Sequence, residues 1–532
     1  MTYDVRDNLP RGCGREDREE FLDTTPAAEW ADPADLAADP ALQFDPDHPG
    51  SKIFLGEVEG QLVGLADDRH VITVAGSRAG KGVSAIIPNL LTWRGAVLAI
   101  DPKGELACIT AEQRAKALEQ RVCVLDPFGR VAHVRGVKDY RVSYNPLTIL
   151  YSGAGQGGEK ALSKTAVEDA GLIADALVVP GGGDTHWDDA ARNLLEGLIL
   201  HVATCEDYRH KRNLVTVREL LMEGAAHEDM KEKDKDKRHK TGMPGLEVQM
   251  RDNAEAVSYR DEDVADAISF AAADFFEKPE TERGSVLSTA RRHTKFLDFR
   301  AIKDVVRRHD FDLTDLKTRA GGMTVYLCLP ATRLSTCSRW LRLFVNLALE
   351  AMERFPDPPP VPVLMVLDEF AVMGRLKQLE DAAGQIAGFG VKLWPVLQDL
   401  TQLKALYAER WETFLGNAGI LQFFGNNDVT TLEFIEKRLG RTTINVKRYG
   451  EVTQDARNQG QKGVSIGPEV HPLMTMDEAA RFFARDDWLA RQLIIRASAE
   501  APMILQRITY FDHPDFKGRA RNCQKEKRTD GV

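Results

Sequence analysis

The feature that most constrains the fold is a succession of three elements between residues 71 and 91. Residues 71–75 (VITVA) form a short apolar run rich in β-branched residues, which is typical of a buried strand. A glycine-rich turn follows at residues 76–82, and residues 84–91 then form an apolar segment of helical character. A strand, a tight turn and a helix in this order predict the start of an α/β unit.

Further apolar runs with strand character recur along the chain, and helix-length segments separate most of them. These runs are residues 96–100, 121–125, 323–329, 363–367, 392–397 and 420–424. Such alternation predicts an α/β fold with a doubly wound, mostly parallel sheet. We assign residues 51–160 and 301–515 to this domain.

The strand signal disappears between the two halves of this domain, and helical signals replace it. Trp187, Ala191, Leu194, Leu198 and Val202 recur at helical spacing along one face. Residues 161–300 are therefore predicted to form an inserted all-α domain.

Two local patterns within this insertion carry separate predictions. Thr216 and Glu219 have the spacing of a capping box just before Leu220 and Leu221, which predicts a helix start. Residues 228–240 hold five acidic and six basic residues in close alternation. We interpret this stretch as a solvated loop or helix end, with a partner-docking site as the alternative.

Both ends of the chain have biased composition. Residues 1–50 contain thirteen acidic and four basic residues and several Asp-Pro breaks, which predicts an extended or disordered acidic arm. Residues 516–532 form a basic tail, which is expected to be disordered, and contact with nucleic acid is the alternative.

Composition narrows the class of protein. A net charge of −11 over 532 residues argues against simple coating of DNA and leaves local basic patches as the means of contact. The seven cysteines lack metal-knuckle or redox-pair spacing, which favours a reducing, cytoplasmic compartment. No apolar run approaches the length of about 18 residues that a membrane helix needs, so a soluble chain is expected.

The turn after the first strand has the composition of a phosphate-binding loop. Small residues let backbone amides surround a polyphosphate, and the Lys81 ammonium would neutralise its charge. Ala75 replaces the first consensus glycine, and Gly82 replaces the hydroxyl residue that usually ligates Mg²⁺, so Ser84 or water would take that role. The predicted ATP-binding residues are Gly76, Ser77, Arg78, Ala79, Gly80, Lys81, Gly82, Val83 and Ser84.

A second chemical signal lies at the end of the apolar run 363–367, where Asp368 and Glu369 are adjacent. The carboxyl edge of an open α/β sheet is where ligands bind. Asp368 would hold Mg²⁺ directly or through water, and Glu369 would polarise the water that attacks the γ-phosphate. Gln398 ends another apolar run and is a candidate γ-phosphate sensor, although many strands simply end in a polar residue.

At this point the chain resembles the TraG-type coupling proteins of type IV secretion systems over residues 50–515. The segments that carry the resemblance are 101–106 (DPKGEL), 187–192 (WDDAAR), 367–371 (LDEFA), 374–376 (GRL), 388–391 (GFGV), 397–399 (LQD) and 414–419 (FLGNAG).

The resemblance implies a RecA-like ATPase domain with an all-α insertion, assembled as a homo-hexamer around a channel. Its expected partners are DNA, in single-stranded form with a relaxase, and components of the secretion channel. A neighbouring subunit would complete each nucleotide site with an arginine, for which Arg375 is the candidate. The family usually begins with two transmembrane helices, and none is evident in this sequence. We expect either a soluble, cytoplasmic member of the family or a chain that a separate protein tethers to the inner membrane.

Two functions remain open on the sequence. The first is an ATPase that uses Lys81, Asp368 and Glu369 to drive DNA or a relaxase–DNA adduct toward the channel. The second is a nucleotide-gated receptor that recruits protein cargo without hydrolysis. Gly82 favours the receptor, whereas the intact Glu369 favours hydrolysis.

Overall fold

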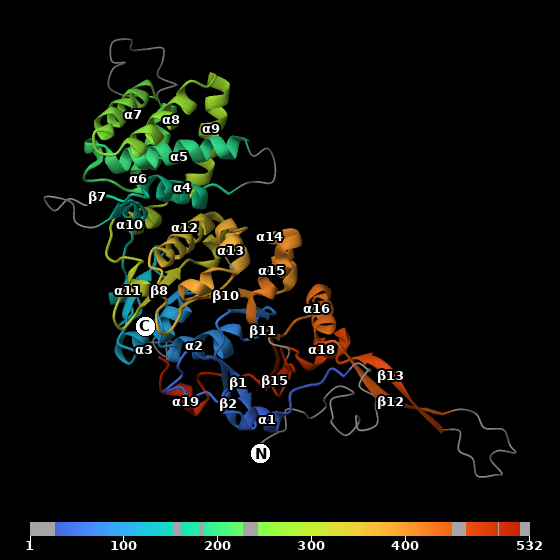
Figure 1. Cartoon of the computed structure of the whole chain (residues 1–532). Coiled ribbons are helices and arrows are strands. Elements are labelled where there is room, and N and C mark those ends of the chain that lie inside the picture. Colours follow the sequence, from blue (N-terminus) through green and yellow to red (C-terminus); the bar gives the residue numbers. More distant parts are fainter. Residues whose placement is uncertain are drawn as a thin grey trace, which may run out of the picture. The chain divides into compact units, whose positions relative to one another are not determined.

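The computed structural model describes residues 27–152, 161–179, 186–226, 243–382, 384–449, 464–497 and 500–521, and Figure 1 shows its elements. The chain forms two compact units, and each is described by itself. The first comprises Met1–Arg94, Val366–Ala371 and Lys392–Ala520, and the second comprises Gly95–Met365, Val372–Val391 and Arg521–Val532.

The sheet of the first unit is parallel at its centre and antiparallel at one side. Strand β3 lies between β10 and β11 and is parallel to both, while β14, β15, β1 and β2 continue the sheet in antiparallel pairs. The strands are β1 (Ile53–Val58), β2 (Gln61–Leu65), β3 (His70–Ala75), β10 (Val391–Leu397), β11 (Ala418–Phe424), β14 (Arg491–Arg496) and β15 (Met503–Gln506).

Helices and a β-hairpin complete the first unit. The hairpin pairs β12 (Arg441–Tyr449) with β13 (Val464–Pro472) as a separate antiparallel ribbon. The helices are α1 (Pro33–Ala38), α2 (Ile87–Thr92), α14 (Leu400–Tyr407), α15 (Trp411–Gly416), α16 (Val429–Leu439), α18 (Met476–Phe482) and α19 (Pro514–Lys517).

The predicted N-terminal arm differs from expectation over the residues that the structure describes. Helix α1 begins where the Asp32 carboxylate accepts a hydrogen bond from the Ala34 amide at 2.9 Å. Trp30, Leu36 and Phe44 are buried. These apolar side chains, spaced between the acidic residues, bury enough surface to order the segment from Ala27 onward. Residues 1–26 lie outside the described part of the chain.

The α/β part of the second unit is also parallel. Strand β8 pairs in parallel with both β4 and β5, and the Leu364 amide of β9 donates to the Ala96 carbonyl at 2.9 Å. Its elements are β4 (Val97–Asp101), α3 (Glu105–Lys116), β5 (Arg121–Leu125), β8 (Met323–Cys328), α12 (Leu334–Glu353), β9 (Val363–Leu367) and α13 (Lys377–Ala382). The predicted α/β class with a mostly parallel sheet is confirmed.

The rest of the second unit consists mainly of a group of helices, drawn from teal through green to olive in Figure 1, together with the short antiparallel pair β6 (Tyr151–Ser152) and β7 (Ala161–Leu162). Helix α5 packs against α4, α8 and α9 because Ala191, Leu194, Leu198 and Val202 are buried along the predicted face. The helices are α4 (Ala166–Leu177), α5 (His186–Thr204), α6 (Leu214–Ala226), α7 (Met243–Ser258), α8 (Glu262–Phe276), α9 (Glu280–Thr294) and α10 (Arg300–Val306). The charged stretch 228–240 lies outside the described residues.

The predicted capping box at Thr216 is wrong. Helix α6 begins three residues earlier than a cap at Thr216 predicts, at Leu214, because the Asn213 side-chain oxygen accepts hydrogen bonds from the amides of Val215 (3.0 Å) and Thr216 (3.3 Å). Thr216 instead donates its hydroxyl to the Lys211 carbonyl at 2.5 Å. Asn and Thr are both good caps, so local spacing alone chose the wrong one.

Two further expectations from the sequence concern membrane helices and cysteines. In the part of the chain that the structure describes, no helix combines the length and the apolar character that crossing a bilayer requires. Cys123, Cys205, Cys328 and Cys337 are free thiols, whereas Cys108 is disulfide-bonded. The scattered spacing of the cysteines did not indicate the disulfide of Cys108, because spacing in sequence does not report proximity in the fold.

Candidate nucleotide-binding site

The predicted phosphate-binding loop leaves β3 against the end of β11. The Gly76 amide donates to the Phe424 carbonyl at 3.1 Å. A β-carbon on Gly76 would lie 1.9 Å from the Gly425 carbonyl oxygen, and one on Gly425 would lie 2.6 Å from the Ala79 β-carbon. Both glycines are therefore required by close approach of two backbones.

The backbone conformation of the loop leaves amide groups available to a ligand. Arg78 and Gly80 have positive φ values of 59° and 94°. The amides of Ser77, Arg78 and Gly80 donate to no other group among the residues that the structure describes. Amides left free by such a turn suit a bound polyphosphate.

Ala75, at the position of the first consensus glycine, is accommodated by packing. It is fully buried in a cluster with Ala79 and Phe424. A methyl group is therefore tolerated at this position, and the departure from the consensus does not distort the loop.

The structure brings Lys81 and the acidic pair together. The Lys81 ammonium lies 2.9 Å from Asp368 Oδ1 and 3.2 Å from Glu369 Oε1. Burial alone would lower the pKa of Lys81, but the two carboxylates outweigh it and raise that pKa. Lys81 is therefore charged, and the three predicted side chains lie in contact. That they form one nucleotide site stays a prediction.

Gln398 joins the same group from the end of β10. Its side-chain amide donates to Glu369 Oε2 at 3.3 Å, and Gln402 accepts from its backbone amide at 3.1 Å. Glu369 has a φ of 56°, a left-handed conformation that is unfavourable for a residue with a β-carbon and is found mainly where function requires it. The turn after β9 thus presents both carboxylate oxygens to different partners.

The segment that follows Lys81 differs from a regular helix. Residues Gly82–Ile86 form a π-turn, which places the Ile87 amide on the Gly82 carbonyl, and α2 continues from there. The Ser84 hydroxyl donates to the Gly80 carbonyl at 3.0 Å. This bond orients Ser84 along its own helix, so its predicted contact with Mg²⁺ stays a prediction, as does the role of Val83.

Arg507 is a supporting residue that sequence reasoning missed. Its guanidinium donates to the Ala79 carbonyl and to the Ala490 carbonyl at 3.1 Å. It also lies over the Phe424 ring, 4.6 Å from the centroid, where a cation is attracted to the π face. Arg507 therefore links the phosphate-binding loop to the segment around Ala490. No sequence motif indicates this role, because Arg507 lies more than four hundred residues after the loop.

Arg375, the candidate trans-acting residue, belongs to the second unit. Its guanidinium pairs with Glu380 at 2.8 Å, and its carbonyl accepts from Arg342 at 2.6 Å. The Glu380 carboxylate is buried, whereas the Arg375 side chain is 57% exposed. Its predicted action on a neighbouring subunit stays a prediction.

The donor set fits a magnesium–nucleotide. Free loop amides and one ammonium suit phosphate oxygens, and Asp368 supplies a hard carboxylate of the kind that Mg²⁺ prefers. Within the described residues no cluster of three or more His, Cys, Asp or Glu side chains could hold a metal by itself. A metal here would therefore depend on phosphate and water ligands, as Mg²⁺ usually does.

The chain is similar to known proteins over most of its length. Residues 50–530 match the family described as "Type IV secretory system Conjugative DNA transfer". The conjugal transfer protein TraG of Escherichia coli is 27% identical over 475 residues, covering 85% of this chain and 68% of TraG. VirD4 of Rhizobium rhizogenes is 26% identical and covers 87% of this chain, which spans 62% of VirD4.

A solved structure shares the fold. The plasmid coupling protein TrwB, in complex with ADP and Mg²⁺, aligns with a TM-score of 0.57 and 14% sequence identity, over 93% of this chain and 97% of TrwB. At this identity the likeness concerns the fold, and it supports the predicted RecA-like domain. Since the family match extends over most of the sequence, the chain belongs to the type IV secretory system conjugative DNA transfer family, as the resemblance to coupling proteins had indicated.

Proposed function

We propose that the protein binds ATP with Mg²⁺ and hydrolyses it to move DNA, or a relaxase–DNA substrate, to a type IV secretion channel. The observation that carries the proposal is the contact of the Lys81 ammonium with both Asp368 and Glu369 beside a loop of free amides. A lysine, an acidic pair and a phosphate-binding turn at one sheet edge are the parts of a P-loop ATPase.

The residues have separable roles in this proposal. The loop amides and Lys81 hold the phosphates, and the residues of the turn from Gly76 to Ser84 form the cradle. Glu369 takes the proton of the attacking water, and Gln398 orients that carboxylate through the bond to its second oxygen. Without nucleotide, the ion pairs of Lys81 with Asp368 and Glu369 balance the charges of these side chains, and a bound phosphate would compete with the carboxylates for the ammonium.

Mg²⁺, held by Asp368 and by Ser84 or water, would neutralise charge on the phosphates. TrwB, which shares the fold, has been solved with ADP and Mg²⁺, and this supports the assignment of cofactors. Arg375 would complete the site of a neighbour in a homo-hexamer. DNA, a relaxase and components of the channel are the proposed partners, and contact with the inner membrane would run through another protein.

The proposal is tested by steady-state ATP hydrolysis with and without single-stranded or double-stranded DNA, while particle mass is recorded. We expect Lys81→Ala to lose nucleotide binding, because the variant lacks the ammonium that would neutralise the phosphates at the loop. Glu369→Gln should bind ATP and hydrolyse it at least about 100-fold more slowly. Wild-type turnover in Glu369→Gln would refute the role of that residue.

A second candidate is a nucleotide-gated receptor for protein cargo. The observation that favours it is the engagement of the Ser84 hydroxyl with the Gly80 carbonyl, together with the lack of a hydroxyl at Gly82. Tight ATP binding without phosphate release under any DNA condition would support this receptor over the ATPase.

A further inference from the structure

Helix α12 joins the helical region to the loop that follows the acidic pair, and Arg342 makes the connection. The buried Arg342 guanidinium donates from Nε to the Ala176 carbonyl at the end of α4, at 3.3 Å. Its Nη1 donates to the Met373 carbonyl at 3.1 Å and to the Arg375 carbonyl at 2.6 Å. One planar side chain therefore ties α4 to the loop 373–375, and a rigid guanidinium fork is well suited to such a link.

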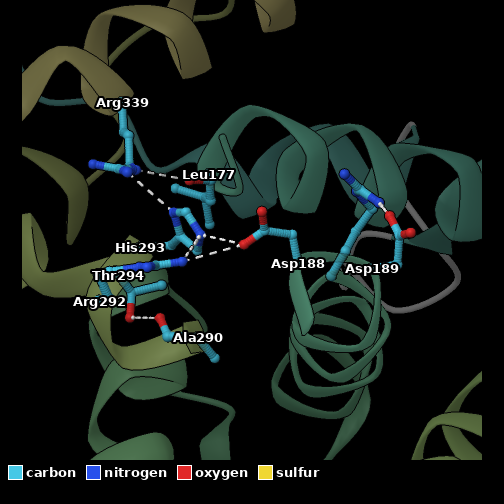
Figure 2. A network of polar contacts seen from close by, with 9 residues as sticks. Leu177, Asp188, Asp189, Ala290, Arg292, His293, Thr294 and Arg339 are labelled. Atoms are coloured by element: carbon cyan, nitrogen blue, oxygen red, sulfur yellow. Dashed lines mark hydrogen bonds and ion pairs between the residues drawn. The ribbon is translucent and has the colours of Figure 1, made fainter. Parts of the chain in front are cut away.

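One helical turn earlier on α12, Arg339 binds the helical region at two points. Its Nε donates to the Leu177 carbonyl at 3.1 Å, and its Nη2 lies 3.0 Å from His293 Nδ1. Figure 2 shows Arg339, His293 and Asp188 in one continuous chain of contacts. Because a guanidinium can only donate, His293 Nδ1 accepts this bond.

The tautomer of His293 follows from these partners. With Nδ1 accepting, Nε2 carries the hydrogen and donates to Asp188 Oδ1 at 3.0 Å. Burial lowers the pKa of His293, which agrees with a neutral ring. Asp188 lies in the WDDAAR segment that the sequence singled out, and Arg292 also contacts it at 3.3 Å. These contacts give Asp188 a structural role, because it orients the ring that receives Arg339.

The loop that Arg342 holds is close to Glu369 along the chain. A short 3₁₀-helix, Phe370–Met373, directly follows Glu369, and Gly374 then turns the chain with a φ of 70°. Glu369 itself is in a strained conformation, which persists only when its surroundings fix the backbone. An anchor on Met373 therefore constrains the segment that begins at the proposed catalytic carboxylate.

We propose that Arg342 is a positioning residue for hydrolysis: by tying the loop 373–375 to the end of α4, it fixes the backbone that presents Glu369 and lets the helical region control turnover. The inference rests on the proposed ATPase function. Arg339, with His293 and Asp188, sets the position of α12 against the same end of α4. A ligand bound to the helical region would act on turnover through these two arginines.

Arg354, at the C-terminal end of α12, provides a matched control for the substitution of Arg342. It follows the last residue of α12, contacts Asp169 of α4 and donates to the Ile149 carbonyl at 3.2 Å. Like Arg342 it joins α12 to α4 and to a backbone carbonyl, but its partners among the described residues are Glu350, Ile149 and Asp169, none of which lies in the loop 373–375. A loss of stability alone should therefore affect Arg354→Gln at least as much as Arg342→Gln, because the buried Asp169 loses its partner.

The test compares wild type, Arg342→Gln and Arg354→Gln for ATP affinity, kcat and hydrogen exchange of the amides in residues 370–376. Arg342→Gln is expected to lower kcat about tenfold while ATP affinity stays within about twofold, because the loop and not the phosphate cradle is released. Exchange in residues 370–376 should become faster in this variant only. Arg342→Lys should recover part of the rate, since an ammonium can still reach one of the carbonyls.

Two results would overturn the inference. Equal kcat in Arg342→Gln and Arg354→Gln, or unchanged exchange in residues 370–376, would show that Arg342 is only structural. If Arg342→Gln does not fold, Arg342→Lys decides in its place, and wild-type kcat and exchange in that variant would count against the proposal. Failure of the ATPase function is distinguishable, because wild type would then hydrolyse no more ATP than Lys81→Ala.

Discussion

Replacing Gly76 by alanine is the most direct test of how the phosphate-binding loop is built. The added β-carbon would lie 1.9 Å from the Gly425 carbonyl oxygen. Carbon and oxygen atoms in contact are about 3.3 Å apart or more, so one backbone must retreat by more than about 1 Å. Neither can do so easily, because the Gly76 amide is bonded to Phe424 and the Gly425 amide to Phe483.

The expected magnitude follows from this overlap. Forcing a methyl group into a packed interior costs about 1–3 kcal/mol, and a contact with a backbone oxygen favours the upper end. A loss of about 3 kcal/mol would lower the unfolding midpoint of a unit of this size by roughly 6–12 °C. Displacement of the loop should also remove nucleotide binding, because the amides of Ser77 and Arg78 follow directly.

Gly82→Ala is the matched control, since nothing lies within 4 Å of a β-carbon at this position. Gly82 is helical, so alanine should leave the unfolding midpoint unchanged or raise stability by up to about 1 kcal/mol. The assay is thermal unfolding of both variants beside titration with a fluorescent ATP analogue. Equal midpoints for the two variants, with wild-type nucleotide affinity in Gly76→Ala, would refute the close-approach argument.

Three further predictions concern residues outside the motifs. Arg507→Gln should weaken nucleotide affinity and lower stability by about 1–3 kcal/mol, because the Ala79 and Ala490 carbonyls lose their donor; wild-type values in an ATP titration and a urea melt would contradict this. His201 has no hydrogen-bond partner for either ring nitrogen among the described residues, and burial lowers its pKa from 6.5 to about 4. Between pH 4 and pH 6.5 the unfolded chain therefore binds more protons than the folded chain. The free energy of unfolding should fall by up to about 3 kcal/mol as the pH drops from 6.5 to 4. Thermal melts of His201→Phe across this pH range should lack this contribution to the pH dependence. Asn213→Ala should destabilise α6 by about 1 kcal/mol, because the helix loses its cap. Glu219→Ala should change stability by less than about 0.5 kcal/mol, because Glu219 is exposed and its ion pair with Arg307 is long, at 3.9 Å. Equal unfolding midpoints for the two variants would instead support the capping box at Thr216.

Part of the fold and site could be predicted because the relevant signals are local. Strands that are buried on both faces appear as continuous apolar runs, so β3, β9 and β10 were evident from residues 71–75, 363–367 and 392–397. Parallel strands bring their carboxyl ends to one edge. This rule was enough to predict that Lys81 and Glu369, almost three hundred residues apart, belong to one site.

The remainder depends on contacts that no local rule reports. The acidic composition of the first fifty residues suggested disorder, but burial of Trp30 and Leu36 is decided by what they meet in the fold. Arg507 and Arg342 illustrate the same limit at the site. Each acts through backbone carbonyls, which every residue possesses, so neither its partner nor its spacing leaves a mark in the sequence. A residue that positions a loop can therefore be identified only from the folded structure. A residue that contacts the ligand must have one of a few side-chain types, which can be recognised in the sequence. This asymmetry explains why the sequence revealed the proposed catalytic groups and not the arginines that hold them.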